Sequence, residues 1–117
     1  MRKVLICCAF ILGSAAQAEE VVIAALGDSL TQGYGLPAEE GFVPQLQAWL
    51  DAEGVEAKIV NAGVSGDTTA GGRARVDWTL TPEVDAMIVT LGGNDMLRGL
   101  DPAQARGNID DILAAAK

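Results

Sequence analysis

The sequence predicts an α/β domain with a parallel sheet. Three short apolar segments alternate with longer segments of helical periodicity, and each apolar segment ends in a turn rich in glycine and polar residues. Strands and helices that alternate in this way form parallel sheets covered on both faces, because each crossover helix packs back onto the sheet. The 117 residues are enough for one small domain and not for two.

The strands are expected where the apolar segments occur. Val21–Leu26 is continuous, short and rich in β-branched residues, which is typical of a buried strand. Ala57–Val60 is expected to form a second strand and Ala86–Leu91 a third. Doubly wound domains usually carry about five or more strands. We therefore expect the sequence to be the front part of a longer chain, which would add two strand–helix units or roughly 60–80 residues.

The first helix is expected over Glu39–Leu50, because its apolar residues recur at helical spacing. Gly54 lies just past its end, where glycine commonly stops a helix. The residues expected to share its buried face are Phe42, Leu46, Trp49 and Leu50.

Two further helices are expected. Thr68–Leu80 is a weaker candidate because it contains Gly71 and Gly72. Pro102–Lys117 has a better start, since Asp101 can cap its amino end and proline is favoured at the first helical position. The residues expected to share the buried face of this last helix are Ile109, Ile112 and Leu113.

Residues 1–18 are predicted to be a secretory signal peptide, which would leave residues 19–117 as the domain. Arg2 and Lys3 form a short positive region, Val4–Leu12 is apolar, and Ala16-Gln17-Ala18 fits a cleavage site. The apolar part is too short to span a membrane. The alternative is a buried first strand that resembles a signal. We expect export through the Sec pathway to the periplasm or the cell exterior.

Composition argues against several functions. Cys7 and Cys8 lie in the predicted signal peptide, so the mature domain would have neither a disulfide nor a thiolate metal site. No lipoprotein box precedes either cysteine, so no stable membrane anchor is expected. The net charge of −8 becomes −10 when Arg2 and Lys3 are removed. Such a domain should repel nucleic acid. The oligomeric state does not follow from the sequence.

Three polar segments each follow a predicted strand, and we expect them to meet at one edge of the sheet. Taken alone, Asp28-Ser29 could cap a helical turn, and the other two segments could be simple turns. No phosphate-binding glycine motif occurs, so nucleotide binding is not expected. The segments are Gly27-Asp28-Ser29, Asn61–Thr68 and Gly92-Gly93-Asn94-Asp95.

Together, the three segments fit an acyl-transfer site, which needs a nucleophile and donors aimed at a developing oxyanion. Ser29 could offer its hydroxyl and its backbone amide. Gly66 could offer a second backbone amide, because a residue without a side chain lets a substrate approach closely. Asn94 could donate from its side-chain amide without adding charge. However, the sequence contains no histidine, and a serine nucleophile normally needs a base.

The same segments resemble the first three conserved blocks of the SGNH, or GDSL, hydrolases. Leu26–Leu30 resembles the first block, and Gly33-Tyr34, Ser65–Thr69 and Leu97-Arg98-Gly99 add supporting matches. The closest resemblance is to the secreted bacterial thioesterase, lysophospholipase and arylesterase branch. It extends from Val21 to Leu113.

The resemblance implies a flavodoxin-like three-layer α/β/α domain that hydrolyses small-molecule acyl esters or thioesters without a metal or cofactor. It implies that Ser29 is the nucleophile and that Gly66 and Asn94 complete the oxyanion hole with the Ser29 amide. It implies structural roles for the carboxylates of Asp28, Asp67 and Asp95.

The family's catalytic Asp and His belong to a late Asp-x-x-His block, which is absent from this sequence. We therefore expect little or no activity from the 117-residue chain alone. Two alternatives remain open at this point. One is a catalytically dead domain that binds acyl or acetylated ligands, and the other is a carbohydrate deacetylase.

Overall fold

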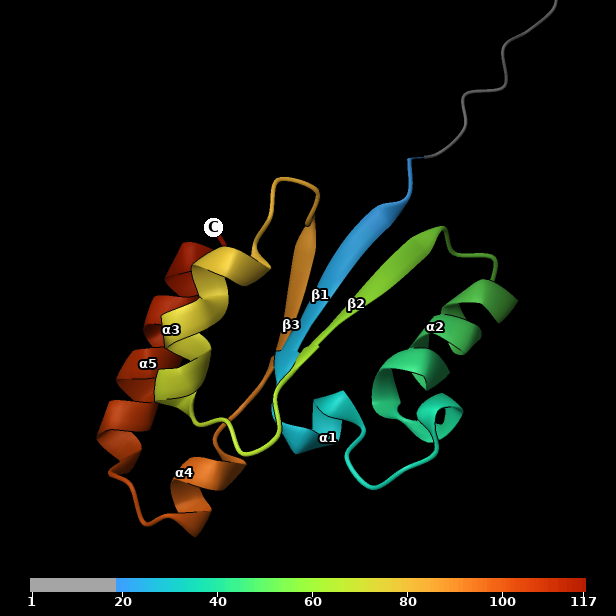
Figure 1. The fold of residues 1–117 in the computed structure, drawn as a ribbon. Helices are drawn as coiled ribbons and strands as arrows, with labels where there is room; N and C mark the ends of the chain where they lie inside the picture. The colour runs from blue at the N-terminus through green and yellow to red at the C-terminus, as the bar shows by residue number, and fades with distance from the viewer. Residues whose placement is uncertain (1–18) are drawn as a thin grey trace, which may run out of the picture.

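The computed structural model describes residues 19–117, so the signal peptide predicted for residues 1–18 lies outside the described residues. Residues 19–117 contain a three-stranded parallel sheet with the order β2-β1-β3 (Figure 1). The strands are β1 (Val21–Gly27), β2 (Ala57–Gly63) and β3 (Ala86–Thr90). The helices are α1 (Ser29–Gln32), the 3-10 helix η1 (Ala38–Glu40), α2 (Phe42–Ala52), α3 (Thr69–Thr79), α4 (Gly93–Leu97) and α5 (Pro102–Ala115).

The predicted α/β class with a parallel sheet is confirmed. Figure 1 shows α2 on one side of the sheet and α3 with α5 on the other. The core beneath α2 is formed by buried Ala25, Val43 and Ile59. The core beneath α3 and α5 is formed by buried Leu26, Val76 and Ile112. Ala25 and Leu26, which are adjacent in β1, therefore pack into the cores on opposite faces of the sheet, because side chains alternate across a strand.

The register brings the three strands to one edge together. Gly27, the last residue of β1, lies beside Gly63 of β2 and Thr90 of β3. Short helices α1 and α4 follow β1 and β3 at this edge, at the bottom of Figure 1. The segments that the sequence predicted to converge thus all begin at one edge of the sheet.

The predicted start of the first helix was wrong. Glu39 belongs to η1, and α2 begins only at Phe42, after extended Gly41. Pro44 explains the delay. In a helix that began at Glu39 it would lie in the interior, where proline breaks the hydrogen-bond ladder and clashes with the preceding turn. In α2 it lies in the first turn, where the N–H groups have no intrahelical partner.

The buried face of α2 also differs from the expectation. Phe42 and Trp49 are 44% and 59% exposed, so their predicted inward positions were wrong. Val43 lies inward instead, and Leu46 and Leu50 pack beside it as predicted. These last three residues are spaced by three and four positions and therefore share one side of the helix.

Helices α3 and α5 agree with the predictions to within a few residues. Thr68 and Asp101 cap them through their side chains, and Pro102 is the first residue of α5. The glycines of α3 reflect close packing. A Cβ added to Gly72 would overlap the side chain of Leu91, which lies just beyond β3.

The predicted face of α5 is correct for two of its three residues. Ile112 is fully buried and Ile109 packs beside it. Leu113 is exposed, which contradicts its predicted inward position. Around the helix, Leu113 lies about 100° from fully buried Ile112, on the far side of Ile109. None of the helices in residues 19–117 is both long and apolar enough to cross a membrane.

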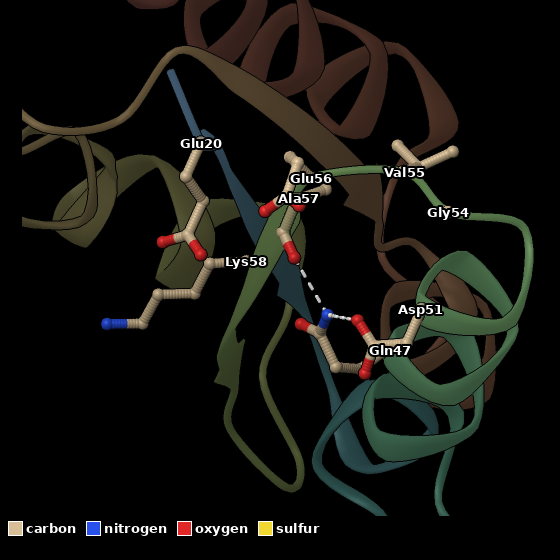
Figure 2. Close-up of a pocket in the computed structure, with 8 residues that line it drawn as sticks. All are labelled: Glu20, Gln47, Asp51, Gly54, Val55, Glu56, Ala57 and Lys58. Atoms are coloured by element: carbon tan, nitrogen blue, oxygen red, sulfur yellow. Dashed lines mark hydrogen bonds between the residues drawn. The ribbon is translucent and has the colours of Figure 1, made fainter. Parts of the chain in front are cut away.

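The outer edge of β2 is capped by Gln47 of α2. Its Nε2 donates to the carbonyl of Ala57 at 2.7 Å, and its Oε1 accepts from the backbone N–H of Ile59 at 2.8 Å. Edge strands otherwise leave such groups open to pairing with another chain. Figure 2 shows Gln47 beside a hollow of about 310 Å³ near the amino end of β2. This hollow is at the opposite end of the strands from Ser29.

Candidate active site

Ser29 is the first residue of α1, directly beyond the end of β1. Asp28 is buried and caps this helix, because its Oδ1 accepts from the backbone N–H of Leu30 at 3.0 Å. The carbonyl of Ser29 accepts from the N–H of Gly33, which ends the helix. The helical turn that Asp28-Ser29 could form in isolation therefore exists, and it fixes the backbone of a partly exposed Ser29.

Two glycines let α1 lie directly on the strand ends. A Cβ added to Gly27 would overlap the side chain of buried Thr31, and one added to Gly63 would overlap the backbone of Gln32. Side chains at these two positions would push α1 away from the sheet. The glycines therefore set how closely Ser29 approaches the second segment.

The second segment is joined to both β1 and α1. The N–H of Val64 donates to the carbonyl of Gly27 at 3.0 Å, and the N–H of Ser65 donates to Oε1 of Gln32 at 2.8 Å. Gly66 follows with a φ of +81°, a left-handed conformation that glycine adopts without steric cost. The turn that presents the Gly66 amide is thus held beside the turn that carries Ser29.

The third segment is joined to the second by two side chains of the α4 region. Asn94 donates from Nδ2 to the carbonyl of Asp67 at 2.9 Å, and Arg98 donates from Nη2 to the carbonyl of Gly66 at 2.7 Å. A primary amide carries two N–H groups, so the bond to Asp67 orients Asn94 and leaves a second donor for a ligand.

Asp95 anchors α4 to the helices behind it. Its carboxylate accepts from the backbone N–H of Thr69 at 2.8 Å and from the Thr69 hydroxyl at 2.6 Å. Asn108 of α5 donates to that hydroxyl at 3.0 Å. Asp95 is only 4% exposed, and it directly follows Asn94 within α4. The network therefore fixes the position of the neighbouring amide.

Replacing Asp95 by alanine is expected to lower the free energy of unfolding by about 3 kcal/mol, because it removes two bonds to a buried carboxylate and leaves the donors of Thr69 without a partner. The matched control is Asp111→Ala, which removes an exposed ion pair with Arg73 and should change stability by about 0.5 kcal/mol or less. Urea denaturation measures both variants. Equal effects would contradict the structural role of Asp95.

The structure brings Ser29, Gly66 and Asn94 to one sheet edge, as the sequence predicted. The side chains of Arg75 and Arg98 also join the segments. The sequence pointed to Arg98 only as part of a family match and did not point to Arg75. No sequence pattern marked Arg75, because its acceptors lie 8, 13 and 48 residues away along the chain. Within residues 19–117, no group of three or more His, Cys, Asp or Glu side chains is placed to hold a metal ion.

Comparisons with known proteins agree with this geometry. Esterase TesA of Pseudomonas aeruginosa is 42% identical over 102 residues, which cover 86% of this chain and 51% of that protein. Thioesterase 1/protease 1/lysophospholipase L1 of Escherichia coli (strain K12) is 38% identical over 104 residues, covering 88% and 48%. The crystal structure of AlinE4, a SGNH-hydrolase family esterase, is 49% identical with a TM-score of 0.78, covering 85% and 54%.

The chain thus spans about half the length of the curated relatives it matches. Residues 25–117 match the GDSL-like Lipase/Acylhydrolase family, and this range includes all three polar segments. Over the part that is covered, the fold of this chain matches that of the esterase structure. The chain belongs to the GDSL-like Lipase/Acylhydrolase family.

Proposed function

We propose that residues 19–117 carry the nucleophile and the oxyanion hole of a serine ester hydrolase. Ser29 attacks the acyl carbonyl through its hydroxyl. The oxyanion that develops is stabilised by the backbone amides of Ser29 and Gly66 and by the side-chain amide of Asn94. The observation that supports this proposal is the 2.9 Å bond from Asn94 Nδ2 to the carbonyl of Asp67, the residue after Gly66, because it orients a side-chain amide that carries a second N–H.

The proposed reaction forms an acyl-enzyme. The Ser29 oxygen bonds to the acyl carbon, the tetrahedral intermediate collapses, and the alcohol or thiol leaves with a proton. Water then adds to the acyl carbon, the bond to the Ser29 oxygen breaks, and the acid leaves while Ser29 regains its proton. A base must remove the Ser29 proton in the first step. The sequence contains no histidine, so in this proposal the base comes from outside these 117 residues, and the chain alone has little or no turnover.

The proposed substrates are small-molecule acyl esters or thioesters. Both classes pass through a tetrahedral oxyanion, so the same three donors serve either one. The relatives support this breadth, since one is named an esterase and another a thioesterase and lysophospholipase. The scheme uses no metal or cofactor. The features of residues 1–18 support export through the Sec pathway to the periplasm or the cell exterior.

The test uses the complete natural gene product that carries these 117 residues. Turnover is measured with p-nitrophenyl acetate and with a short acyl-CoA, and the protein is then treated with a fluorophosphonate and mapped by mass spectrometry. We expect hydrolysis and a single modification at Ser29. Hydrolysis with the label on another residue, or a folded protein that neither reacts nor turns over, would contradict the proposal.

A further inference from the structure

Arg75 of α3 contacts three different parts of the site with one side chain. Its Nε donates to Oδ2 of Asp67 at 2.7 Å, its Nη1 to the carbonyl of Ala62 at 2.7 Å, and its Nη2 to the carbonyl of Gly27 at 2.9 Å. The side chains of Arg75 and Asp67 are only 21% and 16% exposed, so these bonds are shielded from solvent. None of the three acceptors lies in the same turn as another.

We propose that Arg75 is a positioning residue that holds the nucleophile and the two oxyanion-hole segments in their relative places. The inference rests on the proposed function, because it assigns a role to Arg75 in that same reaction. Arg75 itself touches no reacting atom in this scheme. It acts through Gly27, which precedes the turn of Ser29, and through Asp67, which follows Gly66.

The two carbonyl contacts fix the strand ends. Gly27 is the last residue of β1 and Ala62 the last but one of β2. The carbonyl of Gly27 also accepts from the N–H of Val64, so it is shared by the second segment and by Arg75. If the Arg75 side chain moved, the start of the Ser29 turn and the start of the Gly66 turn would therefore move with it.

The contact with Asp67 extends the connection to the third segment. The carboxylate of Asp67 binds Arg75, while its backbone carbonyl accepts from Nδ2 of Asn94. The carboxylate lies against the bare backbone of Gly71, where an added Cβ would overlap Oδ1. A displaced Asp67 would move the Gly66 amide, which is adjacent in the chain, and the Asn94 amide, which is bonded to it.

Only arginine provides this pattern of donors. Its guanidinium is a planar fork with donors that diverge from three nitrogens, and it remains charged in proteins. A lysine at the same position would keep the charge, but its three N–H groups radiate from one nitrogen and cannot span acceptors on β1, β2 and Asp67 at once. Arg75→Lys therefore tests geometry separately from charge.

The same helix supplies a matched control. Arg73 is two residues away and forms an ion pair with Asp111, in which the two side chains are 57% and 52% exposed. Its other contact is a 3.5 Å bond to Asn108. Arg73 contacts none of the three site segments, so Arg73→Lys changes the same residue type on the same helix away from the site.

The experiment compares Arg75→Lys and Arg73→Lys in the complete gene product. Both variants are first shown to be folded by circular dichroism at the assay temperature. We expect Arg75→Lys to lower kcat about 10- to 100-fold and to change KM about threefold or less, since a displacement of about 1 Å can cost about 100-fold. Arg73→Lys should stay within about twofold of the parent protein. A folded Arg75→Lys with the parent's kcat, or with a change in KM alone, would overturn the proposal.

A second readout separates this proposal from the proposed function. If the parent protein shows neither turnover nor labelling at Ser29, the proposed function fails, and amide NMR spectra then test Arg75 directly. Arg75→Lys should shift the side-chain amide signals of Asn94 and the backbone amide signal of Gly66. Arg73→Lys should leave these signals in place. Unchanged signals in folded Arg75→Lys would overturn the positioning role.

Discussion

Ser29→Ala is expected to abolish hydrolysis of p-nitrophenyl acetate by the complete gene product, with a loss in kcat of about a million-fold. The substitution removes the attacking oxygen, and no acyl-enzyme can form without it. The oxyanion donors stay in place, so a residual rate about 10³- to 10⁴-fold above that in water is the floor that remains. Stopped assays at high enzyme concentration measure this residual rate.

The fold should tolerate the substitution. Ser29 is partly exposed at the start of α1, and the cap of that helix comes from Asp28 rather than from Ser29. The control is Thr81→Ala, which removes a hydroxyl in the loop that precedes β3. The hydrogen bond of Thr81 lowers the pKa of Glu83, and this pair is far from the site edge. Thr81→Ala should keep the parent's kcat, whereas turnover retained by Ser29→Ala would rule out Ser29 as the nucleophile.

The sheet and its edge could be predicted because their signals are local. Each apolar segment, such as Val21–Leu26, stops at glycine and polar residues, and the carboxyl ends of parallel strands must share an edge. That reasoning alone places Ser29, Gly66 and Asn94 together. It says nothing about the side chains that join the segments, because their partners lie more than 30 residues away in sequence. Arg75 donates to the carbonyl of Gly27, and Gln32 accepts from the backbone N–H of Ser65.

The two short helices could not be predicted from the sequence for a different reason. Helices α1 and α4 have four and five residues, which is too few for a hydrophobic period to be visible. The predicted start of α2 was wrong because apolar spacing does not reflect the backbone limits of Pro44, which are stricter than any pattern of side chains. The buried face of α2 also differs from the expected one, because Val43 lies inward and Trp49 is 59% exposed.

Asn94→Ala is expected to lower kcat about 100- to 1000-fold, the usual effect of removing one oxyanion donor. The bond from its second N–H strengthens as charge develops on the substrate oxygen, so the effect falls on the transition state more than on the ground state. KM should change much less than kcat. The substitution also removes the bond to the carbonyl of Asp67, which is expected to cost about 1 kcal/mol of stability.

The control for Asn94 is Gln45→Ala, which removes another amide that donates to a backbone carbonyl. Nε2 of Gln45 bonds to the carbonyl of Glu40 at 2.8 Å on the exposed side of α2. This variant should lose a comparable hydrogen bond and keep its kcat. If Asn94→Ala changes only KM, Asn94 binds the substrate in its ground state and is not part of the oxyanion hole. A loss confined to kcat, in a protein as folded as Gln45→Ala, is the result expected when the amide acts on the developing charge.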